Sequence, residues 1–208
     1  MIIQIVIVLL TILFSMTLHE AMHAFVSYWL GDDTARREGR LTLNPIKHID
    51  PFLTILLPLG LAVVGAPIFG GAKPVPFRPD YVRGGDWGAA MVALGGPLTN
   101  LLIAFIAFGV WALVGAPQVG LGAAILSTVI SVNLGFFVFN MIPFPPLDGS
   151  RLLYAVAPEM VRSAMRAIEQ MGVFVIFAIV LIASPLISSY MSAVIGVIID
   201  VFSLVFRV

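Results

Sequence analysis

The chain has 208 residues, of which 60% are hydrophobic and 11% are charged, and its mean hydropathy is +1.08. Soluble domains are nearer half apolar and about a quarter charged, so this composition indicates an integral membrane protein. Eleven basic and eleven acidic side chains cancel, which leaves no overall charge to attract nucleic acid. There is no cysteine, which excludes disulfides, thiolate metal ligands and cysteine nucleophiles.

The first apolar segment, residues 1–30, is long enough to cross a bilayer, and it carries His-Glu-Ala-Met-His at residues 19–23. Residues four apart on a helix lie on one face about a turn apart, so His19 and His23 can bind one zinc ion. Glu20 lies close enough to act on a water beside that ion. Ionisable groups are costly at membrane depth unless they have a function, so this segment predicts a catalytic zinc site.

The next part of the chain mixes polar loops with broken apolar runs. Residues 52–70 are apolar but interrupted by glycine and proline. Irregular backbone is tolerated at membrane depth only where protein or water covers it, so we expect a re-entrant segment there. Residues 73–77 contain two prolines, which suit extended chain and exclude a helix interior or a central strand.

Residues 88–115 and 119–142 are two apolar spans joined by a short connector, which predicts a transmembrane hairpin. Asn140 lies at the end of the second span. It could donate to an oxyanion at the metal, or form an interhelical hydrogen bond. Asn100 follows two glycines and a proline in the first span, and we interpret it as a residue of close helix packing.

Zinc held by two histidines needs a third protein ligand and an open position. Asp148 is the favoured ligand, because the prolines within residues 143–146 break the helix before it and Gly149 permits a tight turn. A helix N-cap is its alternative role. The competing ligands are His48, which we interpret as a hydrogen-bonded structural residue, and Asp200, which we expect to face other helices or an interface.

Beyond this point, residues 158–170 are amphipathic, and the apolar residues 172–206 form either one long kinked span or two short ones. Ten of the eleven basic residues lie in the loops at 31–50, 73–86 and 144–170. The positive-inside rule predicts that these loops are cytoplasmic. Both halves of the zinc site then open on that side, so we expect the site within the membrane, nearer the cytoplasm.

Three motifs together resemble the site-2 protease family of intramembrane zinc metalloproteases. They are His-Glu-Ala-Met-His at 19–23, Gly-Pro-Leu-Thr-Asn at 96–100 and the run from Asn140 to Gly149 that contains Leu-Asp-Gly. Residues 40–45 and 71–76 also look like the membrane-associated β strands of that family. The resemblance covers roughly residues 10–155, and we expect a minimal form without the PDZ or CBS domains that the family often carries.

The resemblance implies a zinc metalloendopeptidase that hydrolyses peptide bonds within or near transmembrane segments of membrane proteins. It implies one zinc ion per chain, a single protease domain over residues 1–208, and a C-terminal amphipathic helix and apolar segment over 156–208. The site residues that it implies are the metal ligands His19, His23 and Asp148 and the catalytic residues Glu20 and Asn140.

The expected fold is a polytopic α-helical protein of the cell membrane, with a transmembrane protein substrate and the lipid bilayer as partners. No nucleic acid is expected, and a homo-oligomer or a regulatory membrane partner stays open. One rival function is metal binding or transport, but a transporter would carry polar residues along several spans, and here they gather at one depth. The other rival is a silent relative that binds transmembrane segments, against which the intact Glu20 argues.

Overall fold

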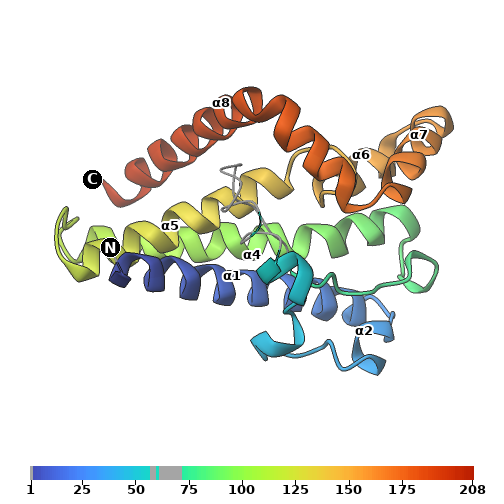
Figure 1. Ribbon diagram of the computed structural model, residues 1–208, viewed down its shortest axis with the longest axis horizontal. Coiled ribbons are helices and arrows are strands. Elements are labelled where there is room, and N and C mark those ends of the chain that lie inside the picture. The colour runs from blue at the N-terminus through green and yellow to red at the C-terminus, as the bar shows by residue number, and fades with distance from the viewer. Residues whose placement is uncertain (1, 57–59, 61–71) are drawn as a thin grey trace.

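Four long apolar helices form the body of the protein (Figure 1) in the computed structural model, which describes residues 2–56, 60 and 72–208. They are α1 (Ile2–Trp29), α4 (Gly85–Leu113), α5 (Leu121–Asn140) and α8 (Val173–Phe206). Each contains a stretch long and apolar enough to cross a membrane, which in α8 is Ile182–Phe206. The chain is therefore a multi-pass helical membrane protein, as its composition predicts.

Shorter helical elements connect these spans. Before α4 they are α2 (Thr34–Arg37), η1 (Pro45–Lys47), η2 (Pro51–Leu56) and η3 (Pro79–Tyr81). After α5 they are α6 (Gly149–Val156) and α7 (Glu159–Gln170). Figure 1 shows α2, α6 and α7 at one end of the molecule, with both chain termini and the α4–α5 connection at the other end. The loops that carry most of the basic residues thus gather at one end.

The expected β strands at 40–45 and 71–76 are not confirmed, because no strand occurs in the described residues. Proline at two positions of the second segment removes backbone donors that a ladder would need. Other hydrogen bonds hold this segment: the Arg40 guanidinium donates to the carbonyls of Lys73 and Pro74, and the backbone N–H of Lys73 donates to the His48 carbonyl at 2.9 Å. The predicted re-entrant segment lies mostly outside the described residues.

Helix α4 packs against α1 on one side and against α5 and α8 on the other. Its small side chains allow this, because small residues let helix backbones approach closely. At Gly109 an added Cβ would lie 2.7 Å from the ring of Phe206 in α8. At Gly95 it would lie 3.1 Å from Val26 of α1. The main apolar cluster lies between α4, α5 and α8 and contains Ala104, Ala107, Phe108, Ile130, Leu134 and Phe202.

Residues 172–206, predicted to be one kinked span or two short ones, contain the single helix α8. It bends part-way along its length (Figure 1) and has Pro185 in its interior. A proline removes one hydrogen bond of the helix and clashes with the preceding turn, which is the usual cause of a sharp kink. The chain therefore returns from the end that carries α7 to the opposite end in one continuous element.

The buried carboxylate of Asp32 ties the loop after α1 to the segment before α4. It accepts hydrogen bonds from the backbone N–H of Thr34 at 3.0 Å and of Arg78 at 2.7 Å, and from the Thr34 hydroxyl. Burial opposes its charge, but the hydrogen bonds from Thr34 and Arg78 outweigh burial and hold the pKa of the Asp32 carboxyl below its usual value. This anchor fixes where the chain turns back towards α4.

Replacing Asp32 with alanine should lower the free energy of unfolding by about 1–3 kcal/mol, because two partly buried hydrogen bonds from backbone N–H groups lose their acceptor. The folded pKa is depressed, so the carboxylate's contribution is fully present above the unfolded value of about 3.9 and is lost as the pH falls below it. Thermal unfolding in detergent at pH 7 and at pH 3 measures both effects. Asp33→Ala is the matched control, since Asp33 makes an exposed i,i+4 pair with Arg37, which is worth little. An equal loss in the two variants would contradict the anchor.

Candidate metal centre

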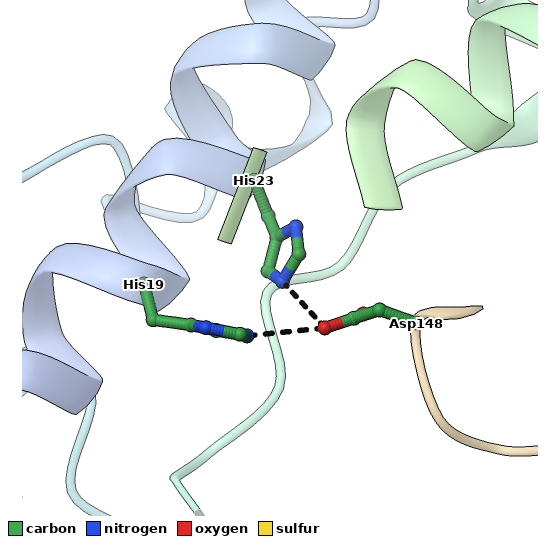
Figure 2. A group of neighbouring side chains, drawn as sticks. All are labelled: His19, His23 and Asp148. Carbon is green, nitrogen blue, oxygen red and sulfur yellow. Dashed lines mark hydrogen bonds and ion pairs between the residues drawn. The ribbon is translucent and has the colours of Figure 1, made fainter. Parts of the chain in front are cut away.

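Three potential metal ligands converge between α1 and the loop that follows α5 (Figure 2). The Nε2 atom of His19 lies 3.1 Å from Oδ2 of Asp148, and the Nε2 atom of His23 lies 3.5 Å from the same oxygen. The three ligand atoms all lie within 4.8 Å of one another. The structure thus brings together the three residues that the sequence predicts as ligands, although Asp148 is 129 residues from His19.

Helix periodicity aligns the two histidines. They lie four residues apart on α1, and their rings meet edge to face with centroids 4.7 Å apart. Asp148 reaches them because the chain leaves the helix after Asn140 and folds back, with Gly149 pressed against the end of α5. A Cβ at Gly149 would lie 2.4 Å from the Met141 carbonyl, so only glycine permits this approach. The side chain of Asp148 makes no N-cap hydrogen bond to α6.

Nδ1, the ring nitrogen of each histidine that points away from Asp148, has a hydrogen-bond acceptor. Nδ1 of His23 lies 2.8 Å from the backbone carbonyl of Val92, and Nδ1 of His19 lies 2.6 Å from Oδ1 of Asn100. The amide nitrogen of Asn100 donates to Oδ1 of Asn133 at 2.8 Å. In the neutral imidazoles these contacts place the proton on Nδ1 and direct the Nε2 lone pairs towards the carboxylate.

This arrangement fits a zinc ion. With neutral imidazoles, two Nε2 lone pairs and a carboxylate oxygen converge, and a cation between them could be bound by all three. Neutral imidazole nitrogen and carboxylate oxygen are ordinary zinc ligands, and three protein ligands with an open position are typical of catalytic sites. Ligating histidines usually donate their other N–H to a carbonyl or carboxylate, as the bonds to Val92 and Asn100 do.

Gly96 lets α4 approach the two imidazoles. A Cβ at this position would lie 2.5 Å from Nε2 of His19 and 2.6 Å from Nε2 of His23, which is closer than any real side-chain contact. Asn100, one turn further along α4, supplies the acceptor for His19. Gly96 therefore lies against the Nε2 atoms of both histidines, and Asn100 has a role beyond the helix packing predicted for it.

Glu20 lies beside the cluster, and its Oε2 accepts a hydrogen bond from the backbone N–H of Val75 at 3.0 Å. Val75 is buried next to the carbonyls of Lys73 and Pro74, to which the Arg40 guanidinium donates. Arg40 is itself buried. The extended segment after residue 71 is thus fixed against the carboxylate of Glu20.

The remaining candidates lie apart from the cluster. His48 is buried, and its Nε2 donates to the Thr42 carbonyl at 2.8 Å, which agrees with a structural role. Asp200 is exposed on α8 and lies beside Arg207 in a surface pocket. Asn140 donates to the Phe136 carbonyl of its own helix at 3.0 Å, so its predicted action on an oxyanion stays a prediction.

Sequence reasoning missed Asn133, although a signal was available. Asn100 lies 16 residues before Ala116, and Asn133 lies 16 residues after Pro117. In a helical hairpin, residues equally far from the turn lie at the same depth, so these two asparagines should face each other. A polar residue in the middle of an apolar span is expected to pair with another.

Comparison with known proteins gives consistent matches. The family model described as "Peptidase family M50" matches residues 114–183. The protein "Putative zinc metalloprotease YwhC" of Bacillus subtilis (strain 168) is 41% identical over 85% of this chain and 80% of that protein. "Putative zinc metalloprotease Rip2" is 27% identical in Mycolicibacterium smegmatis, over 86% of this chain and 67% of that protein. The Rip2 protein of Mycobacterium tuberculosis (strain H37Rv) is 29% identical over 88% of this chain and 69% of that protein. No solved structure matches the chain significantly.

Replacing Gly96 with alanine should lower zinc affinity by at least about tenfold, because the methyl group must displace one imidazole from its place and supporting residues of metal sites typically matter by about 10–100-fold. Competition with a chelator on the purified protein measures the change. Gly135→Ala in α5 is the matched control, since nothing lies within 4 Å of its added Cβ. Native affinity in Gly96→Ala would mean that α4 does not abut the metal site.

Proposed function

The chain belongs to peptidase family M50, the site-2 protease family of intramembrane zinc proteases, and we propose that His19, His23 and Asp148 bind its zinc and that Glu20 is its acid–base. The observation that carries this ligand set is the convergence of three lone-pair donors within 4.8 Å. The family membership favours proteolysis over metal transport.

Zinc, when bound, supplies a Lewis acid that polarises a peptide carbonyl and makes water more acidic. Glu20 takes the proton of the attacking water and later delivers it to the leaving amine. The hydrogen bond from Val75 to one carboxylate oxygen orients the group and leaves the other oxygen for the proton. Asn140 has a second amide hydrogen besides the one directed at Phe136, and this hydrogen is the proposed donor to the developing oxyanion.

The proposed substrate is a transmembrane segment of another membrane protein. A helical substrate keeps its scissile bond within the hydrogen-bond ladder, so it must first unwind, and its backbone groups then need new partners. The extended residues 72–77 lie against Glu20 and offer backbone groups for strand addition. The N–H of Val75 already bonds Glu20, so the added strand would pair with the other groups of this segment.

We place the site within the membrane on its cytoplasmic side. Trp29 and Trp87 are exposed at the same end of the helices, with fractions of 72% and 59%, and such aromatic residues favour the membrane interface. At 1.5 Å per residue, His23 and His19 lie about 9 and 15 Å below Trp29. The basic loops at this end support a cytoplasmic orientation.

The ligand and base roles predict different failures in two variants. Glu20→Gln should abolish cleavage yet retain zinc, because the carboxylate is a base and no ligand. Asp148→Ala should lose both zinc and cleavage, because one of the three metal ligands is removed. Elemental analysis of the purified protein gives zinc per chain, with one expected. Mass spectrometry of a transmembrane peptide that the unaltered protein hydrolyses gives cleavage. Cleavage by Glu20→Gln would refute the proposed role of Glu20 as the base. A full zinc content in Asp148→Ala would refute the proposed role of Asp148 as a metal ligand.

Single cysteines in this cysteine-free chain test the orientation. Exposed positions at Glu38, Asp80 and Ser163 should react with an impermeant thiol reagent only when the cytoplasmic face is accessible, and Gln118 should react from outside. All four lie in loops, in the short helix η3 or on helix α7, so the substitutions leave the proposed site intact. Labelling of positions 38 and 80 from opposite faces would mean that the chain crosses the membrane between them, and the cytoplasmic site would be wrong.

A further inference from the structure

A chain of hydrogen bonds crosses three helices behind His19. Nδ1 of His19 in α1 meets Oδ1 of Asn100 in α4 at 2.6 Å, and the Asn100 amide nitrogen donates to Oδ1 of Asn133 in α5 at 2.8 Å. The Asn133 amide nitrogen donates to the Val129 carbonyl at 2.8 Å. Both asparagines are fully buried, with 0% of their surface exposed. Two primary amides in an apolar interior are costly unless they are paired.

The donor and acceptor directions in this series of hydrogen bonds are fixed at the end farthest from His19, where Asn133 meets the Val129 carbonyl. The backbone carbonyl of Val129 can only accept, so the Asn133 atom beside it is the amide nitrogen and the Asn133 oxygen must face Asn100. Asn100 then turns its nitrogen to Asn133 and its oxygen to His19. The oxygen can only accept, so a neutral His19 carries its proton on Nδ1 and keeps the lone pair on Nε2.

The two histidines are therefore oriented by different means. His23 donates directly to the backbone carbonyl of Val92, whose direction the helix fixes. His19 donates to a side-chain amide, which can rotate by 180° and exchange its oxygen for its nitrogen. If Asn100 rotated in this way, it would donate to Nδ1 of His19, and the proton of the imidazole would move to Nε2. Nε2 could then no longer bind a metal.

We propose that Asn133 is a positioning residue of the metal site, which prevents this rotation of Asn100 and so keeps Nε2 of His19 available to zinc. The inference rests on the proposed role of His19 as a ligand. It predicts that a residue without contact with the metal, on a helix that carries no histidine, sets the zinc affinity through Asn100. A purely structural Asn133 would hold α4 and α5 together but would leave the affinity unchanged.

Asn133→Leu removes both hydrogen bonds while it keeps the number and branching of the side-chain heavy atoms, and it should lower zinc affinity about ten- to a hundredfold. Asn133→Asp retains an oxygen that can accept from the Asn100 amide, so its affinity should lie nearer that of the unaltered protein. Chelator competition gives the affinity of the full chain in detergent, and the absorption spectrum of the cobalt-substituted protein reports the ligand geometry. Both are measured below the unfolding temperature of each variant.

Thr128→Val is the matched control on the same helix. It removes an α1–α5 hydrogen bond, from the Gln4 amide to the Thr128 hydroxyl at 3.2 Å. The hydrogen bonds that join His19, Asn100 and Asn133 are left in place. This variant should be destabilised and still bind zinc with native affinity. An affinity loss in Thr128→Val equal to that in Asn133→Leu would overturn the proposal, because general loosening of α5 would then explain both.

A double variant tests whether Asn133 acts through Asn100. Once Asn100→Ala is present, adding Asn133→Leu should change the affinity no further, whereas independent effects would multiply. His19→Ala separates the proposed ligand set from the proposed positioning role of Asn133. If it binds zinc as well as the unaltered protein, the proposed ligand set fails. If it loses zinc while Asn133→Leu keeps native affinity, the ligand set stands and the role of Asn133 fails.

Discussion

The polar atoms of the metal centre lie among apolar helices, where little water is available and each polar group must find its partner within the protein. This requirement decides where the surrounding residues can be. It places an acceptor behind each imidazole, at the Val92 carbonyl and at the Asn100 amide. It also pairs Glu20 with the backbone of Val75. Helix α4 supplies two of these three partners, and the absence of a side chain at Gly96 brings it close enough to do so.

A second consequence is that the site draws on parts of the chain far apart in sequence. The histidines and Glu20 lie on α1, their acceptors on α4, the carboxylate of Asp148 after α5, and the partner of Glu20 in the extended segment before η3. Packing of small side chains along α4 holds the spans in register. The chemistry therefore depends on helix contacts that contain no reactive group.

Sequence patterns predicted the spans and the histidine pair because these depend on rules that act within one segment. Asp148, which lies far along the chain, was predicted from the helix break before it and from the family resemblance. A run of apolar residues identifies a helix, and the spacing of His19 and His23 places them on one face. For residues 73–77 the same local rules indicated extended chain but could not identify its partner, which is the side chain of Arg40, and no strand is confirmed there. Asn133 was missed for the same reason, since its significance appears only when two spans are read together.

The long separation between the ligands has a consequence for folding as well as for chemistry. A metal held by His19 and Asp148 would close a loop of 129 residues and act as a reversible cross-link. Cross-links over long loops stabilise proteins by reducing the entropy of the unfolded chain. Loss of the metal would free the loop after α5 from α1, so a metal-starved cell would hold a looser protein that is more open to degradation. The same ion that makes the protease active would thus also set its lifetime.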